Sequence, residues 1–311
     1  MKLSVCTGYL ESRFGYERAF EMIKNAGFDA IDYNIDDWWD GSDDKIKTLN
    51  CFGKSEDEIY EYYGKRYECA KSLGLEIGQT HSVFGPAAYL NRRDIFMDVT
   101  RKNILATSVL HSKYTVIHPI ITPGRIADEG YDECHALNLE FFRSLIPDLA
   151  KHGVKIAIEP MWARDAERNI RACVCSRPEE ILQFLDELGE EHFCACPDLG
   201  HIALTASDTG DTVGGALRKL GSATKIIHAH EITKNLDAHT KPYTYPKVMD
   251  WADIGAALRE VGYGGTFNFE VGGNYYAPYT DSLMPEALRH LAEIGKSIVC
   301  VTSLKDDHAS R

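Results

Sequence analysis

The sequence predicts an α/β fold, a (β/α)8 barrel of the TIM type. Short runs of apolar and β-branched residues alternate with helix-like stretches along the whole 311-residue chain. Such strict alternation is typical of a parallel sheet covered by helices. Eight strand-like runs favour a closed barrel over an open sheet, and no Gly-x-Gly-x-x-Gly follows the first run as a dinucleotide-binding domain would need.

The elements follow one another in regular order. Strands are expected at Leu3–Cys6, Ala30–Asn34, Glu76–Thr80, Tyr114–His118, Lys155–Glu159, Phe193–Cys196, Lys225–His230 and Thr266–Val271. Helices are expected at Tyr16–Ala26, Asp57–Leu73, Arg92–His111, Glu133–His152, Pro178–Leu188, Trp251–Val261 and Pro285–Val301. The fourth helix shows the pattern best, because leucine or phenylalanine recurs every four residues from Leu137 to Leu149. Gly27, Gly74 and Gly153 follow helices, where glycine supplies the left-handed residue that ends a helix.

The domain organisation is expected to be simple. A βα-barrel typically uses about 250 residues, and the chain has no Pro/Ser-rich linker or low-complexity tract. We therefore predict one domain over residues 1–311. The acidic, aromatic segment Asp36–Tyr63 follows the second strand. Loops after strands lie on the catalytic face of a barrel, so this segment is a lid, an interface or an ordinary connection.

Charge and composition exclude several partners. The chain has 34 basic and 47 acidic residues, a net charge of −13, which disfavours nucleic acid and anionic membranes. We find no signal-peptide pattern and no apolar run near the roughly 20 residues that span a bilayer, so we expect a cytoplasmic protein. The nine cysteines lack the Cys-x-x-Cys spacing of a zinc knuckle, and we expect them to be reduced and mainly buried.

Four polar residues end the last four predicted strands. They are Glu159, Asp198, His230 and Glu270, at intervals of 39, 32 and 40 residues, about one strand-plus-helix unit each. The carboxyl ends of barrel strands meet at one mouth, and buried carboxylates there would repel one another without a cation. The oxygen-rich set with one nitrogen predicts a divalent metal site, with Mn²⁺ preferred and Mg²⁺, Co²⁺ or Zn²⁺ as substitutes.

Further side chains are expected around this metal. His201 lies three residues past Asp198, His118 closes the fourth strand and His81 follows the third. We expect His81, His118 and His201 to lie close to the metal ligands. His228 alternates with His230, so it faces the same side one layer deeper, and we expect it behind the ligands.

With these motifs the chain resembles the xylose-isomerase-like superfamily of barrels, the sugar phosphate isomerase/epimerase group. The resemblance spans nearly the whole chain. Its motifs are Ile158-Glu159-Pro160, Asp198-Leu-Gly-His201, His228-Ala-His230 and Phe269-Glu270. The resemblance to the ketose 3-epimerases of this group implies that Glu159, Asp198, His230 and Glu270 bind one Mn²⁺-like ion. It also implies that Glu159 and Glu270 exchange the substrate proton and that His201 holds a substrate oxygen. The substrate-binding residues expected on this basis are His81, His118, Trp162, Asp165 and His201.

The implied activity is a metal-dependent sugar isomerase or epimerase. The ion would polarise a carbonyl and stabilise the enediolate. One glutamate would remove the adjacent proton and the other would return it on the opposite face. The partner is expected to be a small sugar or glycoside, and the protein a homo-oligomer. The chain has Asp165 where the epimerases carry glutamate, and Leu236 where they carry arginine, so its substrate clamp differs.

Lyase chemistry is the first alternative. Inosose-type dehydratases and the larger subunit of C-glycoside-cleaving enzymes resemble this barrel too. They begin with the same proton abstraction, after which a leaving group departs. His118, His81 or His201 would then supply an extra acid or base. The aromatic segment Asn274–Tyr279 would suit an aryl group or a partner subunit, or would simply pack as an ordinary loop.

DNA repair is a second alternative, because the barrel also resembles the endonuclease IV type, which uses three metals. That branch needs an Asp-x-His pair after the seventh strand. Asp237 and His239 have this spacing, but they come too early along the chain and in a different context. Three ions per chain would favour this alternative. A binding module without catalysis would instead predict no bound metal.

Overall fold

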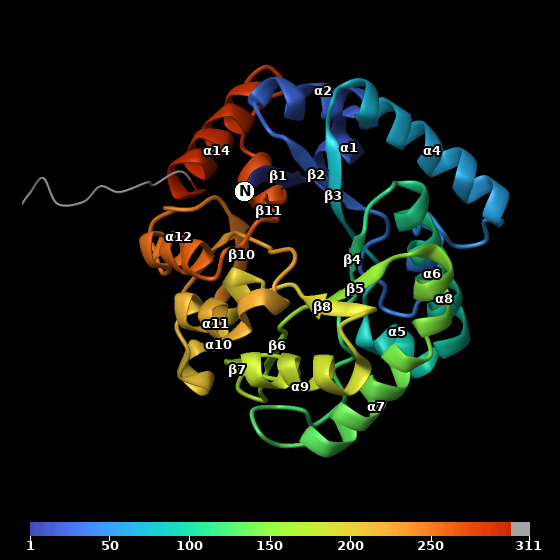
Figure 1. Ribbon diagram of the computed structural model, residues 1–311, viewed down its shortest axis with the longest axis vertical. Coiled ribbons are helices and arrows are strands. Elements are labelled where there is room, and N and C mark those ends of the chain that lie inside the picture. Colours follow the sequence, from blue (N-terminus) through green and yellow to red (C-terminus); the bar gives the residue numbers. More distant parts are fainter. Residues whose placement is uncertain (300–311) are drawn as a thin grey trace, which may run out of the picture.

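Residues 1–299 are described by the computed structural model. Seven parallel strands curl around a central axis with helices outside them (Figure 1). Their order is β11 (Thr266–Phe269), β1 (Lys2–Cys6), β2 (Ala30–Asn34), β3 (Glu76–His81), β4 (Tyr114–Val116), β5 (Lys155–Ile158) and β8 (Phe193–Ala195). The predicted βα-barrel is confirmed, and seven of the eight predicted strands are present with ends shifted by at most two residues.

The eighth position in the ring is filled by an irregular segment, residues 224–230. It touches β8 through the bridge between Ala195 and Thr224, and β11 through the bridge between Ala229 and Phe269. The backbone N–H of Ala229 donates to Asn268 O at 2.8 Å. The prediction of a regular strand at Lys225–His230 was therefore wrong, because this segment pairs with its neighbours only at isolated residues, although it closes the barrel where expected.

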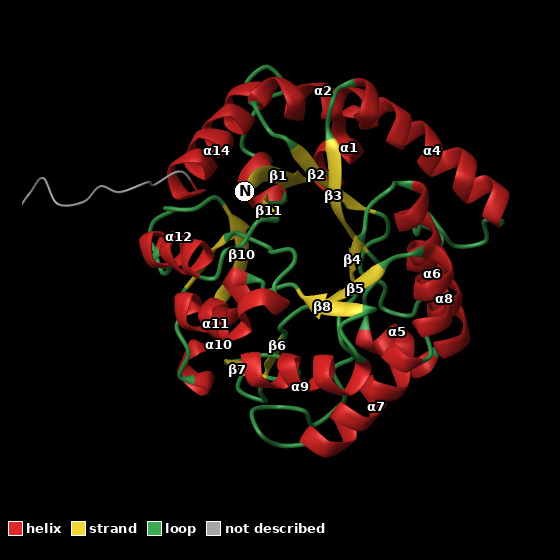
Figure 2. Cartoon of the chain, viewed as in Figure 1, coloured by secondary structure: helices red, strands yellow, loops and turns green. Residues whose placement is uncertain are grey.

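The outer helices agree with the prediction except at one break and at one outer helix that was not predicted (Figure 2). Those expected are α2 (Tyr16–Ala26), α4 (Glu56–Ser72), α6 (Arg93–Val109), α9 (Pro178–Leu188), α12 (Trp251–Glu260) and α14 (Met284–Val299). The helix that was not predicted is α11 (Val213–Leu220), which packs against α9 and α12. The predicted helix Glu133–His152 is two helices, α7 (Tyr131–Arg143) and α8 (Ile146–His152). Pro147 lies in the first turn of α8. Inside a longer helix, a proline has no N–H to donate to the preceding turn and its ring clashes with that turn, so a new helix begins here instead. Residues 300 and 301 of the last predicted helix, with the rest of 300–311, lie outside the described residues.

Several elements were not predicted from the sequence. The helices among them are α1 (Gly8–Phe14), α3 (Asp43–Ile46), α5 (Pro86–Asn91), α10 (Leu199–Thr209), α11 (Val213–Leu220) and α13 (Gly273–Tyr276). Two antiparallel hairpins join β6 (Trp162–Arg164) to β7 (Ile170–Ala172) and β9 (Glu231–Thr233) to β10 (Leu236–Thr240). The second hairpin brings further polar side chains to the centre of the mouth.

Aromatic side chains fill much of the core between sheet and helices. Within Asn274–Tyr279, Tyr275 and Tyr276 are buried, and the ring of Tyr276 stacks on Tyr9 at 5.6 Å. These two tyrosines lie in the short helix α13 and pack into the core. The cysteines among residues 1–299 are free thiols, and most are buried as expected. No helix in this part of the chain has both the length and the apolar character needed to cross a membrane.

Candidate metal centre

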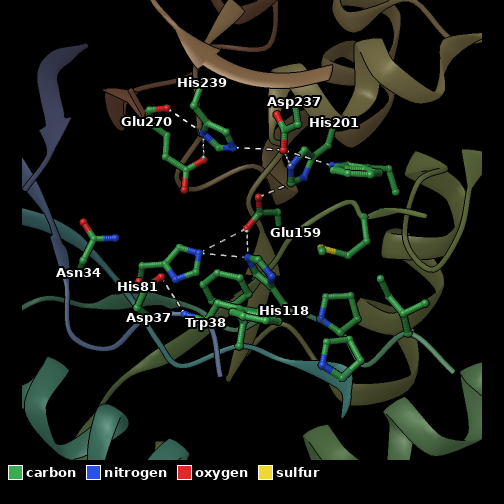
Figure 3. A pocket seen from close by; sticks show the side chains of 16 residues that line it. Asn34, Asp37, Trp38, His81, His118, Glu159, His201, Asp237, His239 and Glu270 are labelled. Atoms are coloured by element: carbon green, nitrogen blue, oxygen red, sulfur yellow. Dashed lines mark hydrogen bonds and ion pairs between the residues drawn. The ribbon is translucent and has the colours of Figure 1, made fainter. Parts of the chain in front are cut away.

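A cavity of about 340 Å³ opens at the carboxyl ends of the barrel strands. Figure 3 shows the side chains that line it. Asn34 ends β2 and His81 ends β3, while Glu159 and Glu270 directly follow β5 and β11. The cavity size is within the range of small-ligand sites, and this mouth is where barrels of this type hold their chemistry.

The first donor group contains three carboxylates and one imidazole. The ligand atoms of Glu159, Asp198, His228 and Glu270 all lie within 4.8 Å of one another. His228 Nδ1 is 3.4 Å from Glu159 Oε1, 3.3 Å from Glu270 Oε2 and 3.9 Å from Asp198 Oδ2. His230, the predicted ligand, also reaches this group, because its Nε2 is 3.1 Å from both oxygens of Asp198.

A second donor group uses the other oxygen of Glu159. His118 Nε2 is 3.0 Å from Glu159 Oε2, and His81 Nε2 is 3.0 Å from His118 Nε2. His81 Nδ1 lies 3.0 Å from the carbonyl oxygen of Ser82, to which it can only donate. The lone pair of a neutral His81 is therefore on Nε2, the ring nitrogen that Figure 3 shows turned toward His118 and Glu159, so Glu159 connects two clusters of donors.

A third donor group is built around Asp237 on β10. His201 Nε2 and His239 Nε2 lie 3.0 and 3.1 Å from Asp237 Oδ2. The other ring nitrogen of each histidine faces a backbone carbonyl: His201 Nδ1 is 2.8 Å from Pro160 O, and His239 Nδ1 is 3.0 Å from Glu270 O. These carbonyls hold the Nδ1–H tautomer and direct the Nε2 lone pairs toward Asp237. His230 completes this group.

The donors fit a cation because several have no other partner. Among residues 1–299, the buried atoms without a hydrogen-bond partner include Glu159 Oε2, His228 Nδ1, Asp237 Oδ1 and Glu270 Oε2. A buried polar atom without a partner is costly. Lone pairs that face each other at about 3 Å need a proton or a metal ion between them, and oxygen-rich sets with imidazole nitrogen suit Mn²⁺ and related divalent ions.

Electrostatic coupling controls the protonation of these side chains. Burial raises the pKa of Glu159, but the imidazoles of His118 and His228 outweigh it and hold that pKa well below its ordinary value. For His239, burial lowers the pKa, while Glu270 and Asp237 raise it more strongly, to about 10. Protons on imidazoles thus compensate the carboxylates when no cation does so.

A buried carboxylate lies behind the first donor group. Asp32 Oδ2 is 3.5 Å from His228 Nε2, on the side of the ring away from the cavity. The same oxygen accepts from Asn268 Nδ2 at 2.8 Å and Gln79 Nε2 at 3.2 Å. Carboxylates in this position orient a metal-binding imidazole and make it a better ligand. Asp32 therefore holds the ring of His228 with Nδ1 toward the carboxylates of the first donor group.

The predicted substrate residues are only partly brought together. His81, His118, His201 and Trp162 line the cavity, and Trp162 Nε1 donates to Asp237 Oδ2 at 3.2 Å. The structure does not bring Asp165 there, because its carboxylate accepts from the backbone N–H of Asn169 and fastens the β6–β7 turn. Leu236, at the position of the epimerase arginine, is 51% exposed.

Three donors lie where the sequence analysis did not place them. Asp237 and His239 were expected to come too early along the chain, but the β9–β10 hairpin turns both into the site. Their Asp-x-His spacing was the available signal. The sequence also placed His228 behind the ligands. Because residues 224–230 are not a regular strand, His228 reaches the carboxylates directly.

An apolar wall covers the donors on one side. Trp38, Phe84, Met161 and Trp162 line the cavity together with prolines and Ile121. Trp38 belongs to the acidic, aromatic segment and is 46% exposed, and its backbone pairs with Phe84. This segment therefore forms part of the mouth, where rings can lie against the C–H faces of a small polar ligand.

These observations define the molecule as a βα-barrel with a donor-lined cavity at its catalytic mouth. The chain belongs to the xylose isomerase-like TIM barrel family, whose sequence model matches residues 20–294. No curated protein matches the sequence.

Solved structures share the fold at low identity. A D-tagatose 3-epimerase-like protein is 20% identical with a TM-score of 0.68, covering 97% of this chain and 98% of its own. The 3-keto-D-glucoside 4-epimerase YcjR from E. coli is 15% identical with a TM-score of 0.66, covering 94% and 99%. The IOLI protein with a bound zinc atom is 18% identical with a TM-score of 0.67, covering 96% and 98%.

Proposed function

We propose that this protein is a divalent-metal-dependent isomerase or epimerase of a sugar or glycoside without phosphate. The observation that carries the proposal is the pair Glu159 and Glu270. Their carboxylates flank His228 Nδ1 at 3.4 and 3.3 Å and line the same cavity. Two ionised carboxylates from non-adjacent strands can take a proton from one face of a carbon and return it on the other. The similar epimerase structures support this class of reaction.

The residues that would hold the ion are Glu159, Asp198, His228 and Glu270, with His230 beside Asp198. We favour Mn²⁺, with Mg²⁺, Co²⁺ or Zn²⁺ as substitutes. The ion would supply the Lewis acid that makes the C–H beside a carbonyl acidic enough for a carboxylate base. The zinc in the IOLI structure supports a metal in a barrel of this shape.

The side chains around the two glutamates have separate tasks. The low pKa of Glu159 keeps it ionised and able to accept a proton. His118, 3.0 Å from Glu159 Oε2, can hold or pass on that proton. His201 and Asp237 lie on the opposite side of Glu159 in Figure 3, where they can bind substrate hydroxyls. Trp38 and Trp162 exclude water from one wall.

The charge of the cavity supports a substrate without phosphate. Within residues 1–299, no lysine or arginine lines the cavity, whereas Asp37, Glu159, Asp237 and Glu270 do. Phosphate groups are normally bound by guanidinium, ammonium or helix N-terminal N–H groups. A polyhydroxylated, uncharged ligand suits a site that has carboxylate acceptors and aromatic faces.

The proposal is tested by stripping the purified protein with a chelator and restoring Mn²⁺. Restored protein should convert at least one member of a panel of ketoses and 3-keto-glycosides, and stripped protein should not. Glu159→Gln should lose about 10²–10⁴-fold in turnover. Glu167→Gln, on the exposed turn of the β6–β7 hairpin, is the matched control and should keep full activity. Equal activity with and without metal would refute the proposal. Product analysis in the same assay separates an epimer from the elimination product of a lyase.

One observation favours a second candidate function, metal-dependent phosphodiester cleavage of the endonuclease IV kind. The third donor group, His201, His230, Asp237 and His239, gives the cavity enough ligands for more than one ion. The net charge of −13 disfavours a DNA partner. Metal analysis decides between them: one ion per chain and no cleavage of a duplex with an abasic site would exclude this candidate, whereas three ions and cleavage would establish it.

A further inference from the structure

A second cavity of about 860 Å³ adjoins the metal-lined one. Its walls come from α1, the start of α2, the end of β2, the region of α3 and the inner face of α4. We call it the α1–β2 groove. The two cavities share Asn34 and Asp37, at and just after the end of β2. Figure 3 shows these two residues at the margin of the metal-lined cavity, so a ligand can extend from one cavity into the other.

The groove has the mixed surface that binds sugar rings. Its aromatic side chains are held in place by neighbours: Tyr9 stacks on Tyr276 at 5.6 Å, and the Arg66 guanidinium lies 3.6 Å from the centre of the Tyr62 ring. Ser12 and Thr48 also line the groove; their hydroxyls donate to the carbonyl oxygens of Tyr9 and Lys45, so they can serve a ligand as acceptors. Apolar faces with a few fixed polar groups are the usual composition of a small-molecule site.

The charged residues of the groove are already paired within residues 1–299. Arg66 Nη2 is 2.8 Å from Glu11 Oε1, and Lys45 Nζ is 4.0 Å from Asp37 Oδ2. Asp36 is buried and accepts from Asn103 Nδ2 at 2.7 Å. A phosphate or carboxylate would have to compete for these cations. The groove therefore suits an uncharged ligand.

Asn34 supplies a fixed donor at the junction of the cavities. Its Oδ1 accepts from the backbone N–H of Gly8 at 2.9 Å and from Cys6 Sγ at 3.0 Å. The Nδ2 group has no acceptor in the described part of the chain and faces the passage between the cavities. An amide donor here can bind a hydroxyl or a bridging oxygen between two ring units.

We infer that the α1–β2 groove binds the second unit of a disaccharide-sized glycoside whose first unit reacts at the metal centre. This inference rests on the proposed function and specifies its substrate class. A free monosaccharide would fill the metal-lined cavity and leave the groove to water. The second ring gains the aromatic and hydroxyl contacts of the groove, which selects glycosides over free sugars.

Ser12→Trp tests the inference, because Ser12 is exposed on α1 and an indole there fills the groove without disturbing the core. Ser72→Trp, at the exposed end of α4, is the matched control. The assay compares kcat/KM of the Mn²⁺-loaded enzyme for methyl 3-keto-glucoside and for 3-keto-cellobiose. Ser12→Trp should lower the value for the disaccharide at least tenfold and change that for the methyl glycoside less than twofold, while Ser72→Trp changes neither.

Two results would overturn the inference. One is wild-type enzyme that uses both compounds with equal kcat/KM, and the other is a Ser12→Trp variant that loses both activities to the same extent. Calorimetry with 3-keto-cellobiose measures binding to the groove without catalysis, so it separates failure of the inference from failure of the proposed function. The proposed function fails if no member of the full panel of ketoses and 3-keto-glycosides reacts, and binding of the disaccharide is then measured on its own. If wild type binds the disaccharide and Ser12→Trp does not, the groove is still supported. If Ser12→Trp binds it as tightly as wild type, or wild type does not bind it, the inference is refuted.

Discussion

Replacing Asp32 by asparagine should weaken metal binding without weakening the fold. Asp32 is fully buried, its Oδ2 accepts from Gln79 and Asn268, and its Oδ1 has no partner in the described residues. Asparagine can keep the same acceptor and place its amide where Oδ1 lies. Only the charge behind His228 is lost.

The stability effect follows from the pKa of Asp32. Burial outweighs the attraction of His228 and raises this pKa from 3.8 to about 6. Because the folded pKa lies above the unfolded one, ionisation destabilises the fold progressively between about pH 4 and pH 6. The difference corresponds to roughly 3 kcal/mol at neutral pH. Asp32→Asn without metal should therefore unfold at the same or a higher urea concentration than wild type at pH 7.

The metal effect has the opposite sign. A charge pair 3.5 Å apart, the distance between Asp32 Oδ2 and His228 Nε2, is worth on the order of 5 kcal/mol at an effective dielectric constant of 20. Only part of this energy would stabilise a metal ion bound at Nδ1 of His228. Loss of such a supporting group typically lowers metal affinity about 10–100-fold, which corresponds to about 1.4–2.7 kcal/mol. Titration calorimetry of the chelator-stripped proteins with Mn²⁺ measures this loss of affinity.

Asp36→Asn is the matched control for this experiment. Asp36 is also buried, with a pKa that burial raises to about 6, but it binds Asn103 and is not part of a donor group. Its Mn²⁺ affinity should stay within about twofold of wild type. If Asp32→Asn also binds Mn²⁺ like wild type, His228 is not a supported ligand and the assignment of the first donor group fails.

Three other predictions follow from the same contacts. Mn²⁺ affinity should rise from pH 6 to pH 9, because Cys196, Glu270 and Glu159 outweigh burial and hold the pKa of His228 well above its ordinary value, and a proton on that imidazole competes with the ion; a pH-independent affinity in calorimetry would contradict this. Trp38→Ala should raise KM several-fold and change the urea midpoint little, since Trp38 is 46% exposed and lines the cavity; an unchanged KM would remove it from the substrate wall. Arg125→Met should cost about 3–5 kcal/mol in urea unfolding, because it leaves buried Glu180 without its partner, whereas Arg93→Met, which breaks an exposed pair, should cost under about 1 kcal/mol.

The features that the sequence predicted are those determined locally. Strand ends such as Glu159 and Glu270 follow short apolar runs, and parallel strands bring their carboxyl ends to one mouth whatever the intervening helices do. The break between α7 and α8 was missed, although Pro147 interrupts an otherwise regular pattern. Periodicity alone concealed it, because three of the four apolar positions from Leu137 to Leu149 are buried in spite of the break.

The features that escaped prediction depend on pairing between distant residues. Asp237 and His239 reach the site because β10 folds back on β9, and chain distance from the seventh strand does not reveal this. Asp165 has the expected offset from Glu159, yet the β6–β7 hairpin turns it into its own loop. The irregular backbone of residues 224–230 likewise decides how deep His228 lies.

The most direct test of the proposed chemistry is deuterium incorporation from D₂O by the Mn²⁺-loaded protein, followed by NMR across the panel of ketoses and 3-keto-glycosides. Proton transfer by Glu159 and Glu270 predicts a label at a single carbon beside the carbonyl of the true substrate. Glu270→Gln should slow that labelling by about 10²–10⁴-fold. Labelling at the wild-type rate in Glu270→Gln, or no label in any compound with the metal-loaded protein, would contradict the account.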